Sequence, residues 1–292
     1  MTSDLAQYLV TGIALGSIYA LVALGFVTVF SVTGAINFAQ GEFVMLGAMI
    51  AAQLVRAGLP LPLAAVAAVA GAALVGALVH QLGLRQAVGR VSPLGLVMIT
   101  IGAATAIRGL ALLAWGTDPR TLPSFTPGPP LEAAGAVIDR QTVWIVITTA
   151  AVLGLVYLLF QRTAVGRALR ACAADLVAAR LVGIDARRMG LISLVLSGAV
   201  GAVGGVALAP ITFASYDMGL MLGLKGFVAA VLGGMANAPG AVAGGLILGI
   251  LEGFATPISS GYKDALAFLV LIGVMLVRPH GLFGGGIGLG RV

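Results

Sequence analysis

The residues whose chemistry most needs an explanation are the amide and carboxylate side chains in "INFAQGEFVMLGAM", residues 36–49, which lies between two long apolar stretches. Asn37, Gln40 and Glu42 fall within six residues there. A catalytic site would need a paired nucleophile and base, and neither histidine of the chain is near in sequence. Amides beside a broken helix instead suit a polar path, where they hold a small zwitterion weakly enough to release it. The three residues are therefore candidates for a pathway or gate, with an ordinary structural turn as the alternative.

Lys225, Glu252 and Arg108 also lie inside apolar stretches, where an ionisable side chain is costly and therefore a functional candidate. If residues 219–235 and 239–257 form an antiparallel pair of helices, Lys225 lies ~18 Å before the turn and Glu252 ~22 Å after it, at about 1.5 Å per residue. Their similar depth predicts an intramembrane ion pair, which either locks the helices near the external face or has a gating or substrate role. For Arg108 we expect snorkelling to the outer interface, with an internal polar cavity as the alternative.

Other chemistries have little support in the sequence. The single cysteine, Cys172, excludes an internal disulfide, and the absence of a CxxC pair or a histidine cluster predicts no metal and no cofactor. No GxxxxGK[ST] phosphate loop occurs, so we expect neither ATP hydrolysis nor another enzyme activity from this chain. The net charge of +6 raises nucleic acid as a partner, but with 60% hydrophobic and 9% charged residues it is better explained by membrane orientation. No nucleic-acid partner is therefore expected.

This composition predicts an all-α polytopic membrane protein, because an apolar helix of about 20 residues crosses the hydrocarbon of a lipid bilayer. Glycines at helical spacing, such as Gly245, Gly249 and Gly253, suit the close packing of such helices. We expect a bundle of eight to ten membrane segments that includes broken or re-entrant helices, because 42–56 is short and "MANAPG" interrupts 219–258. The expected segments are 5–31, 42–56, 61–83, 94–115, 143–161, 189–213, 219–235, 239–257 and 263–277.

The charges of the loops predict the orientation of these segments. Residues 162–188 carry six of the sixteen basic residues, which predicts that this loop is cytoplasmic. Alternate crossings then place the Pro- and Gly-rich loop 117–142 and the N-terminus outside. Met1 to Val10 carry only the charge of Asp4, whereas a cleaved signal opens with basic residues, so we expect the first segment to stay in the mature protein. We expect residues 1–292 to form a single transmembrane domain.

The loop 162–188 has more pattern than a basic anchor requires. Leu169 and Cys172 fall at helical spacing, and the wider pattern predicts one or two short amphipathic helices. Asp175 is suited to cap the second helix, and Gly183 is suited to end it. Two interpretations stay open from these residues alone: an interfacial loop that touches anionic lipid head groups, and a docking surface for a soluble partner that drives the membrane part.

Within this loop, "GRALRACAADLVAARLVGI" resembles the segment of branched-chain amino-acid ABC transporter permeases that contacts the ATPase subunit. "GAINFAQGEFVMLGA", "KGFVAAVLGGMANAPGAVAGG" and "RPHGLFG" resemble other landmarks of that family in the same order. The resemblance is greatest for the smaller of its two permease types, often called the LivH type. It implies a permease subunit of an ATP-driven ABC importer, which moves branched-chain or related small polar amino acids into the cytoplasm by alternating access. A related permease for urea, short amides or a sugar is the alternative, and an ion-coupled secondary transporter is a more distant one.

The resemblance also implies partners and a location. The partners are a second, related permease in a heterodimer, two cytoplasmic ATP-binding subunits, and a periplasmic or external substrate-binding protein. The location is the inner membrane of a bacterium. The loop 162–188 then becomes the coupling loop on which the ATP-binding subunits dock. The residues expected to make this contact are Arg167, Arg170, Asp175, Leu176, Arg180, Leu181 and Gly183.

Overall fold

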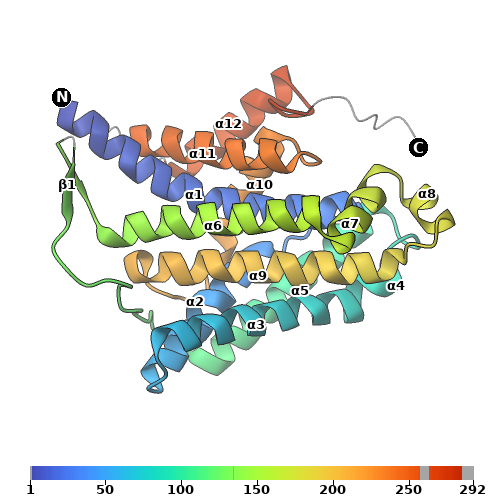
Figure 1. Cartoon of the computed structure of the whole chain (residues 1–292), viewed down its shortest axis with the longest axis horizontal. Helices are drawn as coiled ribbons and strands as arrows, with labels where there is room; N and C mark the ends of the chain where they lie inside the picture. The colour runs from blue at the N-terminus through green and yellow to red at the C-terminus, as the bar shows by residue number, and fades with distance from the viewer. Residues whose placement is uncertain (1, 134, 257–262, 285–292) are drawn as a thin grey trace.

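The computed structural model describes residues 2–133, 135–256 and 263–284 as an elongated bundle of helices, several of which run side by side along its length (Figure 1). The longest helices are α1 (Thr2–Thr33), α3 (Leu61–Val79), α5 (Pro93–Trp115), α6 (Arg140–Arg162) and α9 (Ala186–Thr212). The others are α2 (Gln40–Arg56), α4 (Arg85–Ala87), α7 (Ala164–Ala174), α8 (Leu176–Leu181), α10 (Met218–Gly233), α11 (Ala238–Ala255) and α12 (Lys263–Val277). A π-helical turn, η1 (His80–Leu84), joins α3 to α4, and β1 (Leu131–Ala133) pairs antiparallel with β2 (Ala136–Ile138).

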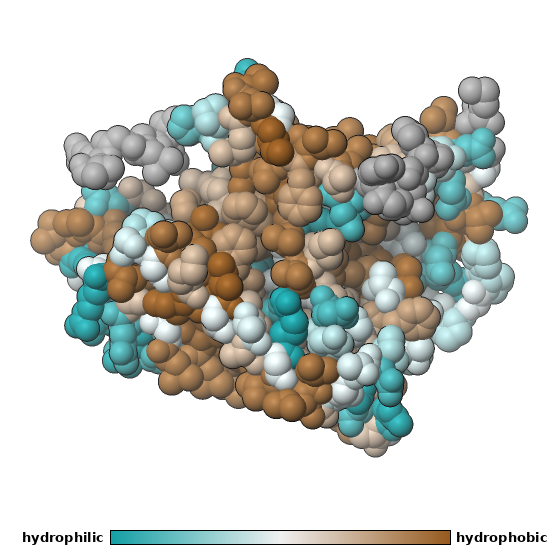
Figure 2. Space-filling view, turned by 180° about the vertical axis from the view of Figure 1, so that it is seen from behind, coloured by the Kyte–Doolittle hydropathy of each residue, from teal (hydrophilic) through white to brown (hydrophobic). Residues whose placement is uncertain are grey.

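Among the described residues, six helices are long and apolar enough to cross a membrane. They lie at Asp4–Thr33, Leu61–Ala87, Pro93–Trp115, Arg140–Arg162, Ala186–Thr212 and Ala238–Ala255. The helices α2, α10 and α12 are apolar but shorter, with 17, 16 and 15 residues. Hydrophobic residues cover most of the middle of the rear face, and hydrophilic residues gather toward its two ends (Figure 2). These features confirm an all-α polytopic membrane protein whose bundle includes short segments.

Polar caps and glycines fix where several helices begin and end. Ser92 Oγ accepts a hydrogen bond from the N–H of Gly95 at the start of α5 (3.2 Å), and Asn237 Oδ1 accepts one from Gly240 at the start of α11 (3.2 Å). Each cap satisfies an N–H that the first turn of a helix leaves unpaired. Gly234 follows α10 with a φ of 108°, a conformation that favours glycine. The "MANAPG" break therefore separates α10 from α11 at the predicted place.

The helices α1 and α11 pack through their glycines. A Cβ atom at Gly249 would lie 2.1 Å from the backbone nitrogen of Gly16, and one at Gly245 would lie 2.5 Å from that of Ala20. Lipid tails supply no hydrophobic drive between helices, so close van der Waals contact between backbones has to hold such a pair together. The glycine stripe of the sequence therefore holds α11 against α1.

Gly249→Val is expected to separate α1 from α11 and to lower the stability of the folded protein by about 3 kcal/mol, because rigid backbone surrounds the added atoms. Thermal unfolding of the detergent-purified protein would measure the change. Gly154→Val is the matched control, since Gly154 lies in α6 and no atom comes within 4 Å of an added Cβ there. Equal stability of the two variants would contradict the role of close packing at Gly249.

The N-terminal end of α1 lies at the same end of the bundle as the β1–β2 hairpin, and α7 and α8 lie at the opposite end (Figure 1). Gln7 Nε2 donates to the Val137 carbonyl oxygen (3.2 Å), and the Val137 N–H donates to Gln7 Oε1 (2.9 Å), which ties the hairpin to α1. The loops 117–142 and 162–188 therefore lie at opposite ends. Which end faces the cytoplasm stays a prediction from loop charge.

Candidate functional site

The helix α2 begins inside the bundle. After α1 ends at Thr33, the chain turns at Gly34, whose φ is 68°, and runs back among the helices. Thr100 of α5 accepts a hydrogen bond from the N–H of Phe38 (3.2 Å) and donates one to the Ile36 carbonyl oxygen (3.0 Å). Thr100 lies seven residues after the start of α5, which is ~10 Å along the helix at about 1.5 Å per residue. The polar segment is therefore a re-entrant break, deeper than a turn at the end of the bundle.

Gln40 joins three helices. Its Oε1 accepts a hydrogen bond from the hydroxyl of Ser197 in α9, and its Nε2 donates to the Ser197 carbonyl oxygen (3.3 Å). The Ser197 Oγ also lies 3.2 Å from the carbonyl oxygen of Gly25 in α1. Gln40 is fully buried. The Gln40 amide therefore fastens α2 to α9 through both its donor and its acceptor, and the Ser197 hydroxyl connects this contact to α1.

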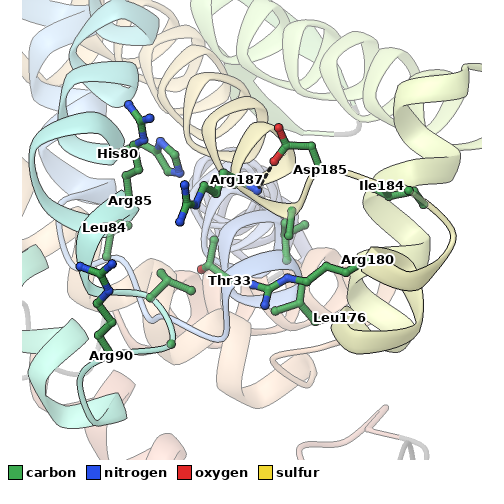
Figure 3. Close-up of a pocket in the computed structure, with 16 residues that line it drawn as sticks. Thr33, His80, Leu84, Arg85, Arg90, Leu176, Arg180, Ile184, Asp185 and Arg187 are labelled. Carbon is green, nitrogen blue, oxygen red and sulfur yellow. Dashed lines mark hydrogen bonds between the residues drawn. The ribbon is translucent and has the colours of Figure 1, made fainter.

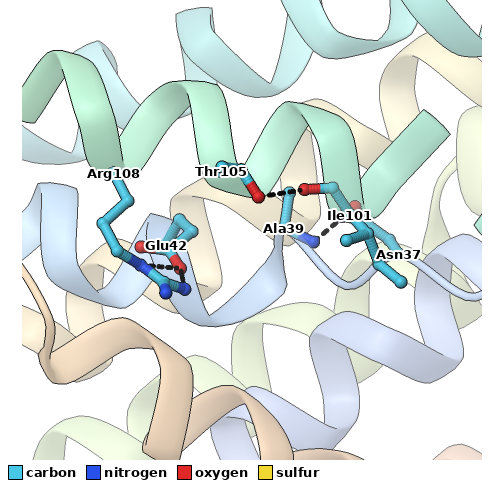
Figure 4. A network of polar contacts seen from close by, with 6 residues as sticks. All are labelled: Asn37, Ala39, Glu42, Ile101, Thr105 and Arg108. Atoms are coloured by element: carbon cyan, nitrogen blue, oxygen red, sulfur yellow. Dashed lines mark hydrogen bonds and ion pairs between the residues drawn. The ribbon is translucent and has the colours of Figure 1, made fainter. Parts of the chain in front are cut away.

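Glu42 forms an ion pair with Arg108 of α5 (Figure 4). The Nε and a terminal nitrogen of the Arg108 guanidinium both donate to Glu42 Oε1. Only 1% of the Glu42 side chain is exposed, against 27% of the Arg108 side chain. The expectation that Arg108 snorkels to the outer interface is wrong, because the re-entrant start of α2 brings a buried carboxylate within its reach.

Two buried polar atoms beside this pair lack a hydrogen-bond partner among the described residues, and they are Asn37 Nδ2 and Glu42 Oε2. Asn37 Oδ1, by contrast, accepts a hydrogen bond from the N–H of Ala39 (3.2 Å), which shapes the turn into α2 (Figure 4). A Cβ atom at Gly219 would lie 2.7 Å from Glu42 Oε2, so this oxygen faces the start of α10. A buried polar group without a partner costs ~1–3 kcal/mol, so each such atom calls for an explanation such as a ligand or water.

The structure brings Lys225 and Glu252 together in an ion pair between α10 and α11. Lys225 Nζ also lies 2.8 Å from Asp264 Oδ1 of α12 and 5.7 Å from the ring centroid of Tyr19 in α1. The Tyr19 hydroxyl donates to Glu252 Oε2 (2.6 Å). Four helices therefore meet at one polar centre, in which the Lys225 and Glu252 side chains are only 12% and 3% exposed.

The loop 162–188 forms α7 and α8, the two short helices that its pattern predicted. Asp175 Oδ1 caps α8, because it accepts hydrogen bonds from the N–H groups that open this helix. Gly183, with a φ of 86°, follows α8 and turns the chain toward α9. Leu169 and Cys172 are buried on the inner side of α7, and burial raises the pKa of the Cys172 thiol.

The outer side of α7 and α8 is exposed and mixes arginines with apolar side chains. Leu181 is 84% exposed, and its neighbours Val177 and Val182 are also largely exposed, whereas Leu176 is half-buried. Exposed apolar side chains that cluster among charges are typical of a protein or membrane contact. The exposed members of the predicted coupling set are Arg167, Arg170, Asp175, Arg180, Leu181 and Gly183.

The sequence matches a family model over residues 8–275, and that family is described as branched-chain amino acid transport system / permease component. The chain belongs to this permease family. It is 35% identical to the high-affinity branched-chain amino acid transport system permease protein BraD of Pseudomonas aeruginosa, over 95% of each chain. It is 34% identical to the corresponding permease protein LivH of Escherichia coli, again over 95% of each chain. The family consists of transport subunits and not of enzymes.

The permease fold also resembles that of a solved structure, "PsaBC from Streptococcus pneumoniae in complex with Fab". The TM-score is 0.51 at 13% sequence identity, and the match covers 96% of this chain and 93% of the other. At this identity the likeness supports the fold alone.

The permease residues that the sequence did not reveal are those whose partners are distant along the chain. Tyr19 and Ser197 carry hydroxyls within apolar stretches, a signal too common to single them out. Asp264 lies at the start of an apolar stretch. A comparison of its expected depth in the membrane with that of Lys225 could have identified the two as partners. Arg108 is recognisable as a charge within an apolar stretch, but no feature of the sequence points from it to its partner.

Proposed function

We propose that this chain is a permease subunit of an ATP-driven importer, which carries branched-chain or related small polar amino acids into the cytoplasm by alternating access. The observation that carries the proposal is the match to branched-chain amino acid permeases over 95% of this chain and of each relative. The names of these relatives favour branched-chain amino acids over urea, short amides or a sugar as the substrate class.

Charge compensation inside the bundle argues against an ion-coupled secondary transporter. Such a transporter needs membrane carboxylates that are free to bind protons or cations. Among the described residues, Glu42 and Glu252 are buried carboxylates, and the charge of each is balanced by a basic partner, Arg108 or Lys225. A bound proton or metal cation would therefore add an uncompensated charge, whereas a zwitterionic amino acid would not. Because the chain has no phosphate-binding loop, its energy comes from two separate ATP-binding subunits.

These ATP-binding subunits dock in the cytoplasm on α7 and α8. The exposed arginines there suit an acidic partner surface, and Leu181 offers an apolar contact among them. A second, related permease completes the membrane part as a heterodimer, and an external substrate-binding protein delivers the amino acid at the opposite end. The assembly lies in the bacterial inner membrane.

The pathway passes Asn37 and Glu42, where α2 begins. Asn37 Nδ2 is a donor for the carboxylate of a zwitterionic amino acid, and Glu42 Oε2 is an acceptor for its ammonium group. Neither atom has a hydrogen-bond partner among the described residues, which supports this assignment. Gln40 stays outside the pathway as a structural contact, because Ser197 engages both ends of its amide.

Uptake of labelled leucine into proteoliposomes tests the proposed function. The chain is purified with the second permease and the ATP-binding subunits, which we expect neighbouring genes to encode, and the loaded binding protein is supplied on the side opposite to ATP. We expect uptake to require ATP. Uptake that persists without ATP and follows an imposed ion gradient would overturn the proposal in favour of a secondary transporter.

Glu42→Gln is expected to lower the leucine uptake rate about tenfold, or ~1.4 kcal/mol, because a neutral amide of the same size replaces the carboxylate that pairs with Arg108 through Oε1 and accepts from the substrate's ammonium group through Oε2. Initial uptake rates, normalised to the amount of protein in the membrane, would measure the effect. Thr105→Val is the control, since Thr105 lies near Arg108 on α5 but donates to Ile101 of its own helix (3.0 Å; Figure 4). Wild-type uptake by Glu42→Gln, or an equal loss in both variants, would contradict the pathway assignment.

A further inference from the structure

A cavity of about 650 Å³ opens at the end of the bundle that carries α7 and α8 (Figure 3). One wall is formed by η1, α4 and the turn after them, and the opposite wall by α8 and the start of α9. The end of α1 contributes Thr33 between these walls. The cavity is separate from the proposed pathway, because none of Asn37, Gln40 and Glu42 lines it.

Four arginines line the cavity, and no carboxylate of the described residues forms an ion pair with any of them. They are Arg85 and Arg90 on the η1–α4 wall, Arg180 on α8 and Arg187 on α9 (Figure 3). Among the described residues, the side-chain partner of Arg85 is neutral: Arg85 donates to the Gln81 side chain (3.0 Å). The walls therefore present four arginines that have no ion-pair partner among the described residues.

Asp185 also lines the cavity, but its carboxylate is already engaged. Its Oδ1 accepts hydrogen bonds from the N–H groups of Arg187 (2.9 Å) and Arg188 (3.3 Å), which caps α9. Its Oδ2 lies 3.2 Å from the guanidinium Nε of Arg188, whose side chain is not among those that line the cavity. Asp185 thus caps α9 and forms an ion pair with Arg188. It forms no ion pair with the four described arginines that line the cavity.

His80 is a second, independent sign that this cavity binds a polar ligand. It lines the cavity, is 3% exposed, and its Nδ1 has no hydrogen-bond partner among the described residues. The other ring nitrogen, Nε2, faces α9: a Cβ atom added at Gly190 would lie 2.9 Å from it. A buried ring nitrogen of this kind is normally satisfied by protein or by an ordered ligand or water.

We propose that this cavity binds a phosphate-type anion, supplied either by the head group of an anionic lipid or by free inorganic phosphate. The planar guanidinium fork matches phosphate oxygens, and four arginines from two walls line one cavity. The cavity lies at an end of the membrane-crossing helices, the level at which lipid phosphates occur. The inference goes beyond the proposed transport function and does not depend on it.

Thermal unfolding of the full chain, purified in neutral detergent with any subunits that stay bound, tests the proposal. The probes are phosphatidylglycerol, phosphatidylcholine, and sodium phosphate against sodium chloride at equal ionic strength. We expect an anionic probe at a hundredfold excess over its Kd to raise the unfolding temperature by about 5 °C. Arg187→Gln and Arg85→Gln, one on each wall, should each raise the Kd of the anionic probe about fivefold, which at the same probe concentration lowers the temperature shift by about a third.

Arg162→Gln is the matched control, because Arg162 is an exposed arginine at the end of α6, next to α7, and does not line the cavity. We expect its response to match the wild type. A response to phosphatidylglycerol alone identifies a lipid head group, and a response to phosphate that competes with the lipid identifies a free anion. Equal responses to phosphatidylglycerol and phosphatidylcholine without a phosphate effect, or equal losses in Arg187→Gln and Arg162→Gln, would overturn the proposal. If Arg187→Gln does not fold, Arg85→Gln decides in the same way.

Discussion

Gly183→Pro and Arg170→Glu are each expected to abolish ATP-driven leucine uptake while the protein stays in the membrane at its normal level. Gly183 has a φ of 86°, and its N–H donates to the Arg180 carbonyl oxygen (3.0 Å). Proline fixes φ near −65° and has no N–H, so it re-aims the exit from α8. Arg170→Glu reverses an exposed charge on α7 and repels the acidic partner surface proposed above. Both sites lie outside the apolar bundle, which is why insertion is spared.

Matched changes at other turns and charges separate coupling from general damage. Gly58→Pro is the control for Gly183→Pro, because Gly58 has a φ of 94° and its N–H donates to the Val55 carbonyl oxygen (2.9 Å) in the turn between α2 and α3. Arg162→Glu is the control for the charge reversal, since Arg162 is an exposed residue at the end of α6. Initial rates of uptake and of ATP hydrolysis would be measured together. Full uptake by both coupling variants, or an equal loss in their controls, would refute the docking role.

The elements of this permease could be predicted to the extent that they rest on local signals. Three of these signals lie within short stretches of sequence. They are the lengths of the apolar stretches, the break at Asn237 and Pro239 before α11, and the alternation of polar and apolar residues in α7. The two short helices with the Asp175 cap and the Gly183 turn followed from residues within one loop. The depth comparison for Lys225 and Glu252 worked because one short turn connects α10 to α11, so sequence distance converts into height along the bundle.

The remaining contacts could not be predicted, because helical periodicity gives the face of a helix without naming its neighbour. Glu42 and Arg108 are 66 positions apart, and Gln40 and Ser197 are 157 apart. The expectation for Arg108 failed because it assumed that no buried counter-charge was within reach, the condition under which snorkelling is favoured. The re-entrant start of α2 supplies that counter-charge, and a re-entrant depth depends on tertiary contacts such as those of Thr100.

The two largest hydrophobic clusters of the described core draw on different helices, and each set of helices forms one of the buried ion pairs. One cluster draws mainly on α2, α3, α5 and α9, where Glu42 meets Arg108. The other draws mainly on α1, α10, α11 and α12, where Lys225 meets Glu252. Gln40 and Ser197 link α2 and α9 of the first cluster to α1 of the second. The Lys225 centre thus fastens helices within one side of the bundle, which favours the role of a lock over that of a gate.

Lys225→Ala and Glu252→Ala are therefore each expected to destabilise the folded protein by ~3–5 kcal/mol, because each leaves a buried charge without its main partner. Glu252→Ala also removes the acceptor of the Tyr19 hydroxyl. Thermal unfolding and the amount of protein in the membrane would measure the loss. Arg188→Ala is the control, since it breaks an ion pair whose side chains are 80% and 50% exposed and should change stability by less than about 1 kcal/mol.

The exchange of the two charges, Lys225→Glu with Glu252→Lys, distinguishes a lock from a gate. It restores the pair, but it also sets a second carboxylate against Asp264, which lies 2.8 Å from Lys225 Nζ in the wild type. We therefore expect partial rescue from the exchange and fuller rescue once Asp264→Asn is added, because the neutral amide no longer repels the new carboxylate. A lock regains both stability and leucine uptake in the triple variant. Recovery of stability without uptake would assign this centre to gating, and no recovery of either would refute the pairing as the source of its stability.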